Sequence, residues 1–120
     1  MNKSIIYYHN PKCSKSREGL EILKQNQIKV EIKLYLSEKM SFIEIKNIIK
    51  KLEMNAIDIV RLKEKIIKDE NINFSNMSDT EIINTLVKYP ILIERPIIVT
   101  GKKAIIGRPP ELIKNFLHTQ

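Results

Sequence analysis

The single cysteine of this 120-residue chain, Cys13, lies between a short apolar run and a helical pattern. Residues Ser4 to Tyr8 are typical of a buried strand, and the amphipathic pattern that follows predicts a helix from Arg17 to Asn26. Cys13 is therefore expected at the N-terminal end of that helix, where backbone N–H groups have no partner within the helix. These donors and the positive end of the helix dipole favour a thiolate or a bound oxyanion.

Basic side chains surround this thiol in the sequence. Lys12, Lys15 and Arg17 are close to Cys13 along the chain, and His9 adds a further positive charge when it is protonated. Positive charge favours the ionised thiol, so we expect these neighbours to lower the pKa of Cys13.

The spacing around Cys13 separates several cysteine chemistries. The C-x5-R loop of tyrosine phosphatases would need arginine at position 19, which is Gly19, and a C-x-x-C redox pair would need cysteine at position 16, which is Ser16. What remains is a single thiol that forms a covalent adduct and is released by a thiol from outside the chain.

Arginine is rare in this lysine-rich chain and occurs only at Arg17, Arg61, Arg95 and Arg108. A planar guanidinium group binds a tetrahedral oxyanion through two parallel hydrogen bonds, whereas an ammonium group acts as a point charge. The four arginines are therefore individual candidates for an anion site.

Composition limits the remaining possibilities. With 120 residues and 42% apolar content, residues 1–120 are expected to form one domain. One cysteine allows no intramolecular disulfide and no thiolate cluster for a metal, and we expect no bound cofactor. No stretch is typical of a signal peptide or a membrane span, so we expect a cytoplasmic protein. The net charge of +7 is spread along the chain and aromatic residues are few, so a solvated surface is a better interpretation than a nucleic-acid site.

The first half of the chain alternates strand and helix patterns. Residues Ile28 to Leu36 alternate with the period of a strand, and a capping box at Ser41 predicts a helix to about Glu53. A short helix is expected to start over Asn55 to Ile59 and to carry Val60 and Arg61, whereas the polar stretch from Lys63 to Asn76 receives no assignment.

The second half begins with another helix and then changes period. A capping box at Ser78 predicts a helix that Pro90 ends. A strand entry at Ile91 to Ile93 is expected next, and then an antiparallel hairpin of Ile97 to Val99 and Ala104 to Ile106. Pro109 and Pro110 suit the first turn of a final helix; its expected apolar face is Leu112, Ile113, Phe116 and Leu117.

The resulting order is β, α, β, a helical insertion, β, β, α. We predict an α/β fold of the thioredoxin-like type, with a small mixed sheet flanked by helices and a cysteine at the amino end of the first helix. This fold also predicts a cis proline facing the cysteine, and Pro96 is the candidate.

Four motifs carry a resemblance to a known family. They are His9-Asn10-Pro11-Lys12-Cys13-Ser14-Lys15-Ser16-Arg17, then Arg61, then Pro90-Ile91-Leu92-Ile93-Glu94-Arg95-Pro96-Ile97, and then Gly107-Arg108-Pro109. From about Ile5 to Leu117, the chain resembles the glutaredoxin-coupled arsenate reductase family.

The resemblance implies a reaction and its partners. Cys13 would attack arsenate as a thiolate, and Arg61, Arg95 and Arg108 would hold the oxyanion and the adduct. Glutathione would act as co-substrate and displace the adduct, and glutaredoxin would resolve the mixed disulfide.

The resemblance also assigns three loop residues. His9 matches a histidine that helps to lower the pKa of the cysteine, and Ser16 and Arg17 match positions that shape the anion site. Ser14 and Lys15 stand where some family members have a Gly-Thr pair, which makes the loop bulkier and more basic.

Other functions remain open at this point. A transcription regulator resembling Spx, which binds RNA polymerase, would share the fold, although such regulators generally carry a C-x-x-C switch and Ser16 replaces the second cysteine. A general glutathione-dependent thiol reductase would keep Cys13 reactive and make Arg61 and Arg108 dispensable. Nucleic-acid binding through the net charge of +7 is the least favoured alternative.

Overall fold

The structure, a computed structural model, describes residues 5–109 and 111–118, with the side chains of residues 117 and 118 outside the described part. The chain divides into two compact units, which we describe separately: Met1–Glu38 with Arg95–Gln120, and Lys39–Glu94. That residues 1–120 form a single domain stays a prediction.

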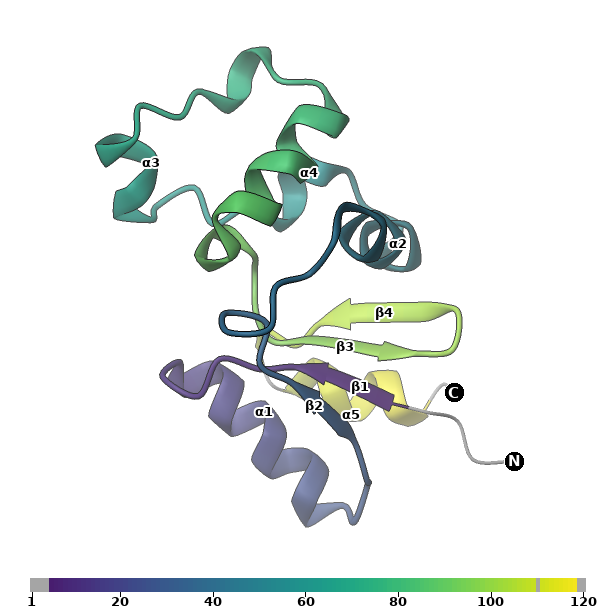
Figure 1. Ribbon diagram of the computed structural model, residues 1–120. Helices are drawn as coiled ribbons and strands as arrows, with labels where there is room; N and C mark the ends of the chain where they lie inside the picture. Colours follow the sequence, from purple (N-terminus) through teal and green to yellow (C-terminus); the bar gives the residue numbers. More distant parts are fainter. Residues whose placement is uncertain (1–4, 110, 119–120) are drawn as a thin grey trace. The chain divides into compact units, whose positions relative to one another are not determined.

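The first unit is a small mixed sheet with two helices. Its strands are β1 (Ile5–Tyr8), β2 (Glu31–Lys33), β3 (Ile97–Thr100) and β4 (Lys103–Ile106), and its helices are α1 (Ser14–Gln25) and α5 (Glu111–His118). The strand order is β2-β1-β3-β4, with β1 parallel to β2 and antiparallel to β3, and β3 antiparallel to β4. Both helices lie on one side of this sheet (Figure 1). The predicted mixed sheet and hairpin are confirmed.

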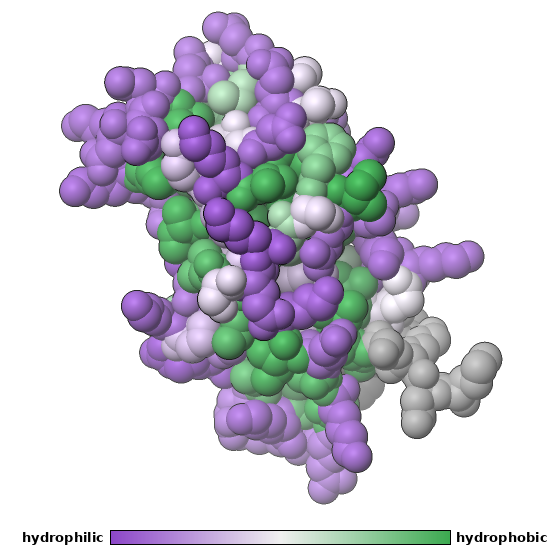
Figure 2. Space-filling view, in the orientation of Figure 1, coloured by the Kyte–Doolittle hydropathy of each residue, from purple (hydrophilic) through white to green (hydrophobic). Residues whose placement is uncertain are grey.

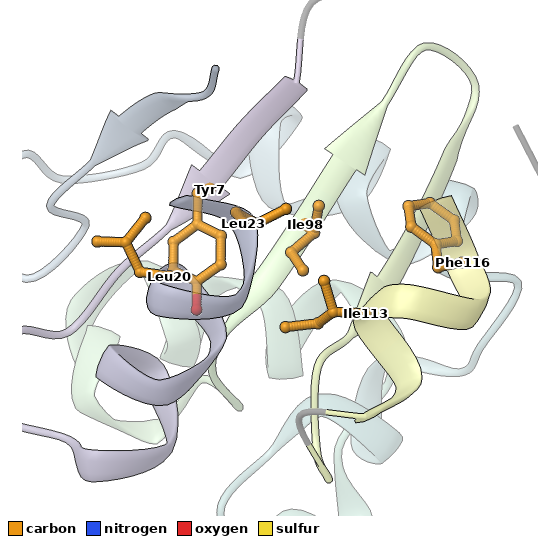
Figure 3. Packing of buried hydrophobic residues seen from close by; sticks show 6 residues of the cluster. All are labelled: Tyr7, Leu20, Leu23, Ile98, Ile113 and Phe116. Carbon is orange, nitrogen blue, oxygen red and sulfur yellow. The ribbon is translucent and has the colours of Figure 1, made fainter. Parts of the chain in front are cut away.

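The core of this unit lies between the sheet and the two helices. Tyr7 of β1 pairs in register with Ile98 of β3, so both side chains point to the same face of the sheet. These side chains meet apolar residues of α1 and α5 (Figure 3). The buried cluster consists of Tyr7, Leu20, Leu23, Ile98, Ile113 and Phe116.

Helix α1 approaches the sheet closely because residue 19 is glycine. A Cβ atom added at Gly19 would overlap the Tyr7 hydroxyl group and would lie 2.8 Å from Cδ1 of Ile113. The glycine therefore permits the contact between α1, β1 and α5, all of which contribute to the same core.

Replacing Gly19 by alanine is expected to destabilise the protein. The added methyl group must displace Tyr7 or Ile113, and such overpacking costs about 1–3 kcal/mol of the free energy of unfolding. Urea denaturation measures this loss. Glu18→Ala, at an exposed position of the same helix, is the matched control, and a Gly19→Ala protein as stable as that control would contradict the packing argument.

Two boundaries in this unit differ from the sequence prediction. Helix α1 starts at Ser14 and not at Arg17, because the Cys13 carbonyl already accepts a hydrogen bond from the Arg17 N–H group. The predicted strand Ile28 to Leu36 is reduced to β2, and the Leu34 carbonyl accepts the N–H groups of Ser37 and Glu38 in a turn. Ile32 consequently points to solvent with 43% of its surface exposed, where the alternation predicted burial.

The C-terminal helix is confirmed as α5, and Ile113 and Phe116 on its predicted apolar face are buried. Leu112 is exposed, which corrects its assignment to that face. The expected roles of Pro110 and of the Leu117 side chain lie outside the described residues.

The second unit is helical. It contains α2 (Phe42–Leu52), η1 (Ala56–Ile59), α3 (Lys65–Asp69), η2 (Phe74–Asn76), α4 (Asp79–Lys88) and η3 (Pro90–Leu92). Both predicted caps form: Ser41 Oγ accepts the N–H of Glu44, and Ser78 Oγ accepts the N–H of Glu81, whose carboxylate accepts the Ser78 N–H in return. On the face shown in Figure 2, many hydrophilic side chains lie at the surface of this unit.

The segments around Val60 and Ile93 correct two sequence assignments. Val60 is not helical but forms an isolated antiparallel bridge with Ile93, and the Arg61 N–H donates to the Leu92 carbonyl at 2.7 Å. Residues Ile91 to Ile93 are accordingly no strand entry, because Pro90–Leu92 forms a 3-10 turn. These hydrogen bonds join segments far apart in sequence, which local periodicity does not detect.

The stretch from Lys63 to Asn76, which the sequence left unassigned, contains α3 and η2. Within the ranges that the structure describes, no helix combines the length and apolar character needed to cross a membrane.

Candidate active site

The strand register places three loops at one end of the sheet. Tyr8 pairs with Ile97, and Ile97 pairs with Ile106, so the ends of β1 and β4 and the start of β3 are aligned. The loop that follows β1 carries Cys13, Arg95 precedes β3, and Arg108 follows β4. A thiol and two guanidinium groups from distant parts of the sequence are thereby brought to the same end of the first unit.

The pairing of the hairpin continues past β3 and β4. The Gly107 N–H donates to the Pro96 carbonyl at 2.8 Å, which keeps the segments carrying Arg95 and Arg108 adjacent. The Arg95–Pro96 peptide bond is cis, as predicted from the sequence. Pro96 is fully buried, and its Cγ atom lies 3.4 Å from a Cβ position built on Gly19 of α1.

The Cys13 loop is held by its own backbone and polar side chains. The Cys13 N–H donates to the Asn10 carbonyl at 3.0 Å, and the Lys12 N–H donates to Asn10 Oδ1 at 3.0 Å. Arg17 donates from its guanidinium group to the Pro11 carbonyl at 2.8 Å. Arg17 therefore supports the loop backbone, and its predicted role in shaping the anion site stays a prediction.

Several groups act on the pKa of Cys13. Burial raises it, but this effect is outweighed by a hydrogen bond from the Arg95 side chain, by the backbone N–H groups of Ser16 and Lys15, and by the positive charge of Arg95. The net result is a lowered pKa. The direction agrees with the expectation for a cysteine whose sulfur lies near free N–H groups at the start of α1, and Arg95 contributes to the lowered pKa.

Cys13 is expected to ionise at lower pH in the folded protein than in the denatured chain. Iodoacetamide alkylation followed against pH measures both midpoints, and the denatured midpoint should lie at about 8.5. Because folding lowers this pKa, the thiolate stabilises the folded protein fully above the denatured-state pKa, and this contribution is lost as the pH falls through the folded-state pKa. If the folded and the denatured protein had the same alkylation midpoint, the lowered pKa of Cys13 would be contradicted.

The histidine of the motif contacts Ser16. His9 is buried, and its Nδ1 atom lies 2.7 Å from Ser16 Oγ. Burial lowers the pKa of His9, and the positive charges of Arg17 and Lys24 lower it further, so the imidazole is neutral at pH 7. A neutral ring adds no positive charge beside Cys13, and the role of His9 in lowering the pKa of Cys13 stays a prediction.

Two residues that sequence reasoning assigned no function take part in this network. The Tyr7 hydroxyl donates to the Ser16 carbonyl at 2.6 Å, and burial raises the pKa of Tyr7, so it remains a neutral donor. Asn10 holds the loop as described above. The Asn10-Pro11 pair is a turn signal that could have identified Asn10, whereas no local pattern links Tyr7 to Ser16.

The fourth arginine lies in the second unit. The guanidinium group of Arg61 is 3.5 Å from a Glu64 carboxylate oxygen and 3.8 Å from one of Glu94, and its Nε atom is buried with no hydrogen-bond partner among the described residues. The predicted role of Arg61 in oxyanion binding stays a prediction. In the described ranges, no group of three or more His, Cys, Asp or Glu side chains is placed to hold a metal ion.

Known proteins resemble this chain in sequence and in fold. The chain is 41% identical to an arsenate reductase of Haemophilus influenzae, over 95% of this chain and 99% of that protein. Its structure superimposes on an arsenate reductase from Vibrio cholerae with a TM-score of 0.89 and 38% identity, covering 96% of this chain and 98% of the other.

A regulator is also among the relatives. The global transcriptional regulator Spx 2 of Bacillus anthracis is 30% identical over 94% of this chain and 86% of its own length. Residues 8–116, which include Cys13, Arg61, Arg95 and Arg108, match the ArsC family. With this match over nearly its whole length, and with a thioredoxin-like sheet that places a cysteine at the start of α1, the chain belongs to the ArsC family.

Proposed function

We propose that this protein reduces arsenate to arsenite through a covalent adduct on Cys13. The observation that carries the proposal is the strand register, which brings Cys13, Arg95 and Arg108 to one end of the sheet, where Arg95 lowers the pKa of Cys13. The arginine stabilises the attacking thiolate, and guanidinium groups are suited to the oxygens of a tetrahedral oxyanion. The arsenate reductases among the relatives support this substrate.

The reaction begins with attack of the Cys13 thiolate on arsenic. A sulfur–arsenic bond forms and an arsenate oxygen leaves as water after protonation, so arsenic remains pentavalent. N–H groups at the start of α1 and the guanidinium groups of Arg95 and Arg108 would stabilise the negative charge on the remaining oxygens. For Arg61, a part in this step is implied by the family resemblance alone.

Reduction follows when a glutathione thiolate attacks the Cys13 sulfur. A disulfide forms between glutathione and Cys13, the sulfur–arsenic bond breaks, and its electron pair stays on arsenic, which leaves as arsenite. Since the chain has no second cysteine, an outside thiol must release the enzyme. A glutaredoxin thiolate attacks the glutathione sulfur of this disulfide and frees Cys13 as a thiolate.

The chemistry of this chain calls for thiols from its surroundings instead of a resident cofactor. Glutathione enters as co-substrate, and Cys13 must be reduced before each turnover. We therefore place the reaction in the cytoplasm, where glutathione keeps thiols reduced.

The decisive experiment follows NADPH oxidation by the purified protein with arsenate, glutathione, glutaredoxin and glutathione reductase. We expect NADPH to be oxidised only when arsenate, glutathione and glutaredoxin are all present. Arsenite must appear in a ratio of one to each NADPH oxidised, because both conversions transfer two electrons.

The same assay separates the proposal from the alternative thiol chemistry. With glutaredoxin left out, a general glutathione-dependent reductase would oxidise NADPH with a small glutathione mixed disulfide as substrate and would not respond to arsenate. That pattern, or a reactive Cys13 without turnover of either substrate, would refute the arsenate proposal.

A further inference from the structure

Strand β2 forms one edge of the sheet, and its outer side pairs with none of the strands that the structure describes (Figure 1). On its inner side, the Lys33 carbonyl accepts the His9 N–H group at 2.9 Å, in continuation of the pairing with β1. Because the backbone groups of alternate residues in a strand point to opposite edges, the N–H and carbonyl groups of Ile32 face away from β1. The backbone of Ile32, the middle residue of β2, can therefore pair with a further strand.

The side chain of Ile32 is an exposed continuation of the apolar core. Ile32 is in register with Tyr7 of β1, whose side chain lies in the buried cluster between the sheet and the two helices. Residues in register on neighbouring strands point to the same face, so Ile32 extends this apolar face to the edge of the sheet. Its side chain is 43% exposed, and Leu34, two residues further on, is 37% exposed. A second strand placed against β2 would remove part of this apolar surface from water.

The charges of β2 are complementary to those of a second β2 strand that runs antiparallel to it. When a two-fold axis passes through Ile32, this residue faces its own counterpart, and each Glu31 faces the Lys33 of the other copy. Opposite charges at directly facing positions stabilise paired strands, and like charges destabilise them. An axis through Glu31 or through Lys33 would instead set that charge against its own counterpart. The charges therefore select the register centred on Ile32, the residue whose backbone groups face outward.

The opposite edge of the sheet, strand β4, lacks these features. Lys103 of β4 is exposed, and the exposed Lys102 precedes it in the turn. From Lys102 to Arg108, the sequence has no acidic residue that could face these lysines in an antiparallel pair. None of the exposed large apolar side chains found among the described residues belongs to β4. Lysines on an edge strand oppose pairing with another edge, so only β2 combines open backbone groups with complementary charges.

We propose that two copies of this chain associate by antiparallel pairing of their β2 strands about a two-fold axis at Ile32, which joins the two sheets into one. The partner is a second copy because β2 itself supplies the apolar contact, the hydrogen-bonding groups and both complementary charges. The paired strands are short and bury little surface, so the dimer is expected to dissociate on dilution from about 1 mM to about 10 μM. This association does not depend on the proposed arsenate chemistry.

Sedimentation equilibrium measures the association constant and tests the charge pairs. Glu31→Lys and Lys33→Glu should each lower this constant about tenfold, because each replaces two attractive pairs by two repulsive ones. The double variant, in which the two charges are exchanged, should return to within about threefold of wild type. Glu21→Lys, at an exposed position of α1, is the matched control and should associate as the wild type does. A wild-type chain that stays monomeric at about 1 mM, or a double variant as weak as the single variants, would refute the proposal.

A disulfide cross-link tests the register. In a Cys13→Ser background, Ile32→Cys places two thiols at the axis, where the Cα atoms of a hydrogen-bonded antiparallel pair are about 5.5 Å apart, a distance that a disulfide spans. Oxidation with copper phenanthroline should then give a covalent dimer in non-reducing gel electrophoresis. Leu34→Cys in the same background is the matched control, because its two copies would lie about 13 Å apart along the strands and should not cross-link. No covalent dimer with Ile32→Cys, or equal cross-linking of the two variants, would overturn the proposal. None of these measurements uses arsenate, so a failure of the arsenate assay would leave them interpretable.

Discussion

Replacing Cys13 by serine is expected to lower arsenate-dependent NADPH oxidation to the rate measured without enzyme. A serine hydroxyl is not ionised near neutral pH, and it can form neither the sulfur–arsenic bond nor the disulfide with glutathione. The Arg95 side chain and the N–H groups at the start of α1 stabilise a thiolate that the variant lacks. Since the chain has one cysteine, no second thiol can take over.

Two controls accompany this variant. Circular dichroism and thermal unfolding should remain close to wild type, because oxygen replaces sulfur at a half-buried position with little change in packing. The Ser14→Ala protein should retain full turnover at the neighbouring exposed position. Arsenate reduction above background by a folded Cys13→Ser protein would show that Cys13 is not the nucleophile.

Local signals in the sequence predicted the elements that depend on neighbouring residues. The caps at Ser41 and Ser78 are formed by side chains three residues from their partners, and both helices begin as expected. The hairpin of β3 and β4 likewise depends on a short turn, where Gly101 adopts a φ of +57°. Such features require no knowledge of the rest of the fold.

Errors occurred where distant segments decide the structure. The alternation from Ile28 to Leu36 predicted a longer strand than β2, which pairs with β1 from Glu31 to Lys33 before the turn at Leu34. The bridge between Val60 and Ile93 joins two segments that were predicted to be helix and strand entry. In each case, hydrogen bonds between remote residues override the local pattern.

Some features of the candidate site could likewise be predicted from local patterns, whereas others depend on the folded chain. The position of Cys13 at a helix start followed from two adjacent patterns, and the motifs indicated the arginines. The charge of His9 could not be predicted, since it depends on burial and on Arg17 and Lys24, which only the folded chain brings to bear on the ring. The effect of Arg95 on the pKa of Cys13 also depends on the strand register, which brings the two residues to the same end of the sheet.

Replacing Arg95 by lysine is expected to lower kcat/KM for arsenate about 100-fold while the protein remains folded. Lysine keeps the positive charge but offers a point charge in place of the planar fork, so one of the paired hydrogen bonds to the oxyanion is lost. The loss of one donor to developing charge typically costs a factor of about 100 to 1,000. Arg95 also donates to the Cys13 sulfur, so the pKa of Cys13 should rise in the variant.

These two effects of Arg95 can be measured separately. Iodoacetamide alkylation reports the thiolate alone, and arsenate turnover at a pH where the thiol is fully ionised reports the oxyanion contact. Arg17→Lys is the matched comparison, because the Arg17 guanidinium group donates to the Pro11 carbonyl at 2.8 Å and supports the loop. We expect Arg17→Lys to lower kcat/KM for arsenate less than Arg95→Lys does. If Arg95→Lys turned over arsenate at the wild-type rate, the planar fork would be unnecessary, and a thiol reductase without an arsenate site would explain the reactive cysteine better.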